Sequence, residues 1–136
     1  MSELHTDALV AKTEEIPALA GHTFVTIAPH GAAKPYMVWH PAQGTNTQES
    51  VTGPRVTRRP RYTGHLVAED ARQVQRLLDL LEAKLFPSGR GAVLEVEGER
   101  SFPLWFESPL PIQVQTDPQP TIVYAVVECG WRSDPV

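Results

Sequence analysis

The clearest pattern in the chain is a stripe of large aliphatic residues at helical spacing between residues 69 and 86. Spacings of three and four residues place them on one face of a helix. The stripe consists of Ala71, Val74, Leu78, Leu81 and Leu85, widened by Leu77. Glu69 and Asp70 at the start and Lys84 at the end match the helix macrodipole, and Pro87 follows. The pattern predicts a long amphipathic helix that packs on a sheet.

A looser helical pattern occupies residues 2–15, where no proline interrupts the chain. Ser2 is a suitable N-cap, and Pro17 either ends the helix or opens a short turn closed by Gly21. The apolar positions that follow helical spacing here are Leu4, Ala8, Leu9, Ala11 and Ile16. These residues predict an N-terminal helix with a modest apolar face.

Before the long helix, short β-rich runs lie at residues 23–27 and 36–40. A third run, residues 55–67, alternates between two faces. Val56, Tyr62 and Leu66 would face one side of the sheet, and Thr57, Arg59, Arg61 and Thr63 the other. Pro60 cannot donate a ladder hydrogen bond, so part of this run is predicted to be an edge strand or a bulge.

After the long helix, residues 92–106 are predicted to form a hairpin that turns near Gly98. Residues 112–115 are expected to pair with the final run. That run, Ile122 to Trp131, is apolar on both faces, which is typical of a central strand covered on both sides.

The order of these elements predicts an α+β fold with a single antiparallel or mixed sheet, on which the N-terminal helix and the long helix pack. The chain is 136 residues long, which suits one domain covering residues 1–136. Residues 41–54 are polar and nearly uncharged. We expect them to form an excursion or hairpin loop, and loops of that length are usually functional or disordered.

Composition narrows the class of protein. The hydrophobic content of 41% and the charged content of 21% are ordinary for a globular domain. Cys129 is the only cysteine, so an internal disulfide and a zinc finger are excluded. The first residues do not resemble an export signal, and no apolar stretch is long enough to span a bilayer. We therefore expect a soluble intracellular protein without a membrane partner.

Catalytic and metal chemistry find little support in the sequence. The five histidines show no metal-binding spacing, so we expect scattered surface or strand-end histidines. Cys129 is expected to be buried and inert. Glu95, Glu97 and Glu99 alternate along the predicted hairpin, on one solvated face. The sequence predicts no catalytic residue, no metal and no cofactor, and hence no enzyme.

The strongest local feature of charge is an arginine cluster in a chain of net charge −4. It consists of Arg55, Arg58, Arg59 and Arg61. Three interpretations remain open: a contact with an acidic neighbouring subunit, a contact with nucleic-acid phosphates, or a charged edge strand that resists aggregation. Together with the polar excursion, the cluster supplies the candidate interface residues. From the excursion these are Gln43, Asn46, Gln48 and Glu49.

The ordering of several segments resembles the tail terminator proteins of long-tailed bacteriophages. The segments are "IPALAG", "APHGAAKPYMVWH", "RRPRYTGHLV", "AEDARQVQRLLDLLEAKL" and "TIVYAVVECGW", and they span most of the chain. Proteins of this family are small α+β subunits that form a ring at the head-proximal end of the tail. The stretch "FPLWFESPLPIQVQTDPQP" departs from the commoner pattern of the family.

The resemblance implies a structural virion protein that is assembled in the host cytoplasm. Six copies would form a ring that stops polymerisation of the tail tube and joins the tail to the head. The implied partners are other copies of the chain, the tail tube protein and a head-completion or connector protein, with DNA passing through the lumen. The arginine cluster would lie at a subunit interface or toward that lumen.

Other functions remain open at this stage. A different neck protein, such as a head–tail connector or stopper, shares the small size and ring assembly. A small nucleic-acid-binding module would use the strand Arg55 to Arg61 to contact phosphates. A small hydrolase is the third alternative, although the sequence indicates no pair of residues as its catalytic centre.

Overall fold

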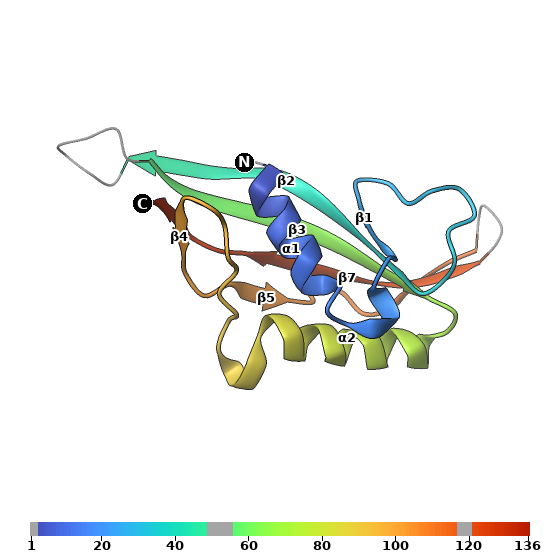
Figure 1. The fold of residues 1–136 in the computed structure, drawn as a ribbon. Helices are drawn as coiled ribbons and strands as arrows, with labels where there is room; N and C mark the ends of the chain where they lie inside the picture. The colour runs from blue at the N-terminus through green and yellow to red at the C-terminus, as the bar shows by residue number, and fades with distance from the viewer. Residues whose placement is uncertain (1–2, 49–55, 117–120) are drawn as a thin grey trace.

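The structure of the protein is a computed structural model, which describes residues 3–48, 56–116 and 121–136. Within these residues, an eight-stranded mixed sheet carries two α-helices (Figure 1). The elements in chain order are α1 (Glu3–Thr13), η1 (Pro17–Leu19), β1 (Thr23–Val25), β2 (Tyr36–Gln48), β3 (Val56–Ala68), α2 (Ala71–Leu85), η2 (Pro87–Gly89), β4 (Glu99–Ser101), β5 (Trp105–Glu107), β6 (Gln113–Gln115), β7 (Ile122–Gly130) and β8 (Ser133–Pro135). The predicted α+β class is confirmed.

The strands follow the order β1-β2-β3-β7-β5, with β6 also paired to β7 and β8 joining β3 to β4. β1 runs parallel to β2, and the other pairs are antiparallel. The arginine-bearing strand β3 therefore lies between β2 and β7 or β8. Of the two predicted alternatives for this run, an edge strand or a bulge, the edge strand is not found, because β2 pairs with one side of β3 and β7 or β8 with the other.

The hairpin of β2 and β3 is longer than the sequence predicted. Pairing extends from Tyr36 opposite Val67 to Gln48 opposite Val56, so β2 does not end at His40. The register shifts at Pro60, because two residues of β2 stand opposite it between the pairs Ala42–Arg61 and Thr45–Arg59. The predicted bulge at this proline is confirmed, and it accommodates the missing backbone donor. Residues 49–55 lie outside the described chain.

The segment after α2 differs from the predicted hairpin. β4 pairs with β8 and β5 pairs with β7, instead of with each other. Gly98 does form a turn, with a φ of 76°. The turn places β4 beside the C-terminal strand β8. The backbone N–H of Val136 donates to the Gly98 carbonyl at 3.1 Å and holds the turn there. Pairing of β6 with β7 agrees with the prediction.

Helix α2 confirms the strongest sequence pattern. Asp70 caps it by accepting a hydrogen bond from the Gln73 backbone N–H at 2.8 Å. Its buried residues are Val74, Leu77, Leu81 and Leu85. Ala71 is exposed, so the buried face is narrower at its N-terminal end than the predicted stripe.

Helix α1 forms as predicted, and its buried face coincides only in part with the predicted one, since Leu9 is buried and Ala8 packs against the core. Its buried residues are His5, Leu9 and Thr13, whereas Leu4 and Ala11 are exposed. Thr13 Oγ1 donates to the Leu9 carbonyl at 2.9 Å and accepts from Trp39 Nε1 at 3.0 Å. The apolar pattern misled the prediction here, because the buried polar side chains of this face have specific hydrogen-bond partners in the core.

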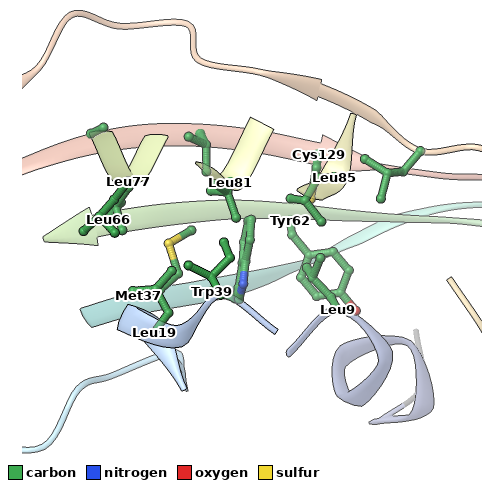
Figure 2. Packing of buried hydrophobic residues seen from close by; sticks show 14 of the residues in the cluster. Leu9, Leu19, Met37, Trp39, Tyr62, Leu66, Leu77, Leu81, Leu85 and Cys129 are labelled. Carbon is green, nitrogen blue, oxygen red and sulfur yellow. The ribbon is translucent and has the colours of Figure 1, made fainter. Parts of the chain in front are cut away.

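Both helices pack on the same face of the sheet. Figure 2 shows Trp39 of β2 and Tyr62 of β3 in one cluster with Leu9 of α1 and Leu81 of α2. Tyr62 stacks on Trp131 with a centroid separation of 5.7 Å. Among the described residues, no helix is both long enough and apolar enough to cross a membrane.

The other face of the sheet is only partly covered. In β7, Ala125, Val127 and Cys129 are buried, while the alternating residues Tyr124 and Val126 are half-buried. The prediction of a strand covered on both sides is therefore wrong for β7. Strand β7 has strand partners on both edges, but one of its two faces points away from the helices.

Candidate assembly surfaces

The predicted arginine cluster lies along the first half of β3. Arg58 and Arg61 are exposed, and Arg59 is half-buried. Arg58 pairs through its backbone with Asn46 of β2 and Ser133 of β8. This end of β2 and β3 reaches past the helices in Figure 1. Arg55 lies outside the described residues.

Two further arginines, which the sequence analysis missed, join this cluster. Arg100 in β4 and Arg132 after β7 place their guanidinium groups over the Phe102 ring, at 5.7 and 5.0 Å from its centroid. Arg132 also lines one hollow together with Arg59 and Arg61. No local signal marks these two residues, because only the β4–β8 pairing brings them together. We call Arg58, Arg59, Arg61, Arg100 and Arg132 the arginine end.

Acidic residues partly neutralise the arginine end. Arg132 donates from Nε and Nη2 to the two carboxylate oxygens of Asp134, both at 3.2 Å. These bonds, with one from Thr57 Oγ1 at 2.8 Å, lower the pKa of Asp134. Arg61 lies 3.6 Å from the Glu128 carboxylate. Internal pairing of this kind weakens the attraction for phosphates and orders the side chains for a protein contact.

An open hollow of about 620 Å³ lies within the arginine end. It is lined by Arg59, Pro60, Arg61, Pro103, Trp105, Trp131 and Arg132. Arg61 stands 5.5 Å from the centroid of the Trp105 ring, and this ring is 40% exposed. Arginine and tryptophan are the residue types enriched at the energetic centres of protein interfaces. The hollow therefore has the composition of a contact surface.

A largely buried hydrogen bond between His5 and Glu99 lies beneath this end of the molecule. His5 Nε2 lies 3.0 Å from Glu99 Oε1, which also accepts a hydrogen bond from Ser133 Oγ at 2.9 Å. The prediction that Glu99 lies on a solvated face is wrong, and so is the prediction of a surface role for His5. Both side chains connect α1 to β4 and β8, which fixes β4 with its Arg100 and the start of β8 next to Arg132.

The residues predicted from the polar excursion are placed only in part. Gln43, Asn46 and Gln48 lie in β2, where Asn46 is opposite Arg58 and Gln48 is opposite Val56. Glu49 lies outside the described residues. Within the described chain, β1 pairs with β2 only from Met37 to Trp39, so the rest of that edge of β2 has no strand partner. An unpaired edge is a natural template for contact with another chain.

The partly covered face of the sheet holds a pair of histidines. His40 Nε2 lies 3.2 Å from His65 Nδ1, and the His65 ring meets Tyr124 edge-on at 5.6 Å. Burial, and secondly the neighbouring His40, lower the pKa of His65. The sequence analysis missed this pair, because only the β2–β3 register brings the two residues together. Among the described residues, no group of three or more His, Cys, Asp and Glu side chains could hold a metal.

No protein-family model and no curated protein matches this chain. Among solved structures, a chain of the virion of a native gene transfer agent particle has a TM-score of 0.60 at 15% identity, covering 95% of this chain and 96% of that chain. A second solved chain, which carries only a sequence identifier, has a TM-score of 0.53 at 20% identity and covers 96% of each chain. At such identities the likeness shows a shared fold over nearly the whole length.

Proposed function

We propose that this chain is a structural subunit of a phage-like virion, and specifically a tail terminator. Six copies would form a ring at the head-proximal end of the tail, where they stop polymerisation of the tail tube and provide the joint to a head-completion protein. The observation that carries the proposal is the fold likeness, end to end, to a chain of a gene transfer agent virion. The terminator role itself rests on the resemblance of the ordered sequence segments.

The surfaces of the molecule support self-assembly. A ring needs two different complementary patches on each subunit. The arginine end is one such patch, with an exposed tryptophan at its centre. On the two helices and their flanks, the exposed acidic groups available to a neighbouring copy are Glu3, Asp7, Glu69, Asp79 and Glu82, and the exposed Arg72 and Arg76 lie among those of α2. Opposite charges of this kind steer association and fix orientation.

The hairpin of β2 and β3 supports contact with a second component. It projects past the helices, and within the described residues its β2 edge has no strand partner beyond Trp39. In the proposed ring this arm, with Gln43, Asn46, Gln48 and Glu49, contacts the tail tube or the connector. The arginine end lies at the subunit interface or toward the lumen for DNA. The proposal assigns no reaction to the protein.

The proposal is tested by the assembly state of the purified protein together with tail-tube binding. Light scattering and negative-stain images are expected to reveal rings of six subunits, which bind one end of isolated tail tubes. Arg61→Glu should weaken ring formation, and Arg90→Glu, an exposed arginine outside the arginine end, is the matched control. Retention on duplex DNA at low salt, lost in Arg58→Glu and Arg59→Glu, would instead support the nucleic-acid-binding alternative.

A further inference from the structure

The face of the sheet opposite the helices brings two imidazoles together on neighbouring strands. His40 of β2 stands opposite Thr63, and His65 of β3 stands opposite Val38, so the two histidines are diagonal neighbours. Both side chains are half-buried, and their ring centroids are 4.8 Å apart. Diagonal neighbours on one face of an antiparallel pair are within reach of each other when their side chains are long or aromatic.

The separation of the two facing nitrogens suits a shared metal ion. His40 Nε2 and His65 Nδ1 are 3.2 Å apart. Two imidazole nitrogens bound at about 2.0–2.1 Å to one tetrahedral zinc ion lie roughly 3.3 Å from each other. We propose that His40 and His65 form a two-imidazole site for a divalent transition-metal ion, such as Zn²⁺, Ni²⁺ or Co²⁺.

The pair would need little rearrangement to accept the ion. Without metal, one imidazole donates its N–H to the other across the 3.2 Å between the two nitrogens. With metal, both rings remain neutral and each keeps its proton on its other nitrogen, His40 on Nδ1 and His65 on Nε2. Imidazole is a preferred ligand of zinc, nickel and copper, and both of its nitrogens serve as donors to metals.

The surroundings leave room to complete the coordination. The two histidines line an open hollow of about 350 Å³, together with Tyr36, Gln115, Tyr124 and several apolar residues. Water molecules can occupy the remaining positions there, as they do in open zinc sites. The edge contact of Tyr124 restricts the His65 ring. The nearest carboxylate by register is Glu128, opposite Thr63, and it is engaged by Arg61.

The binding site would connect the two strands of the hairpin near its base. An ion that binds only the folded protein stabilises it by mass action, so the melting temperature should rise with metal concentration. With two protein ligands the site should be weaker than a closed site of four ligands. Cys129 does not compete for the ion, because it is buried on the other face and burial raises its pKa.

The test is a titration of the untagged full chain with Zn²⁺ and Co²⁺, followed by calorimetry, cobalt absorption and thermal melting. One ion should bind per chain, and His40→Gln and His65→Gln should each reduce the affinity at least about tenfold. His30→Gln, in an exposed loop, is the matched control and should bind normally. Absence of binding by the wild-type protein would overturn the proposal, as would equal binding by wild type and both site variants.

A second measurement does not depend on variants that fold. In nitrogen-15 spectra of the wild-type histidines, zinc should shift His40 Nε2 and His65 Nδ1 and leave His22 and His30 unchanged. Shifts confined to other histidines, or absent from this pair, would overturn the proposal. Neither experiment involves ring formation, so its failure is distinct from failure of the proposed terminator function.

Discussion

Gly64 is the position at which the fold should be least tolerant of a single added carbon. It lies in β3, opposite Trp39 in β2 and Val127 in β7. A Cβ at this position would lie 2.6 Å from Trp39 Cζ3 and 2.8 Å from Cε3, and it would overlap Met37 Cε. The Met37 methyl can rotate away. The indole cannot easily follow, because its Nε1 donates to Thr13 Oγ1 at 3.0 Å.

The expected cost of Gly64→Ala follows from this overlap. Overpacking of a well-packed core typically costs 1–3 kcal/mol, whereas Gly→Ala restricts the unfolded chain and returns about 0.4–1 kcal/mol. The free energy of unfolding should therefore fall by roughly 0.5–2 kcal/mol. The sheet should still form, because the backbone of Gly64 does not need a positive φ.

The assay is urea denaturation of four proteins: wild type, Gly64→Ala, Met37→Ala and the double variant. Met37→Ala alone should cost about 2–5 kcal/mol, since it empties a fully buried site. In the double variant the new methyl enters part of the vacated volume, so the combined cost should be less than the sum by at least ~0.5 kcal/mol. Unchanged or increased stability of Gly64→Ala, or strict additivity, would refute this reasoning.

Three further predictions concern the core and the arginine end. Thr13→Val removes the acceptor of the buried Trp39 N–H, so it should lower the free energy of unfolding by about 1–3 kcal/mol. The same denaturation assay measures this, and an unchanged free energy of unfolding would contradict it. Burial raises the pKa of Tyr62 from 10.0 to about 12, and the hydrogen bond with Thr6 opposes this shift in part. The stability that the protonated Tyr62 contributes is therefore complete below pH 10 and is lost as the pH rises toward 12. Tyrosinate absorbance should show one of the three tyrosines ionising late, and that late phase should be absent in Tyr62→Phe; simultaneous ionisation of all three in the folded protein would contradict this. Arg61→Glu should change the denaturation midpoint little, because exposed ion pairs contribute about 0–1 kcal/mol to stability. The same variant should reduce the mass of the assembly in light scattering, and an unchanged mass would contradict the proposed interface.

The elements that could be predicted from the sequence carry their own local signal. Helix α2 has a stripe, a cap and a terminating proline, and β7 has a long run of β-branched and apolar residues. Residues 41–48 lack such a signal, since they have few apolar side chains. Their strand is stabilised by pairing with β3, which no local pattern reveals. Burial of His5 and Thr13 was missed for the same reason, because their partners are distant in sequence.

The candidate surfaces divide in the same way. Arg58, Arg59 and Arg61 stand out in the sequence because they are close together in it. Arg132 joins them only through the order of the strands, and the His40–His65 pair depends on a register that is fixed by the whole hairpin. Charge clusters within one strand can thus be read from a sequence, whereas sites assembled across strands require the topology.

The most direct test of the account is the mass of the purified chain by light scattering over a concentration series, with negative-stain images of the largest species. Six copies of a 15.0 kDa chain give a ring of about 90 kDa with a central opening, and this is the result the account predicts. Single copies at every concentration, with no binding to the ends of isolated tail tubes, would contradict the proposed role as a tail terminator.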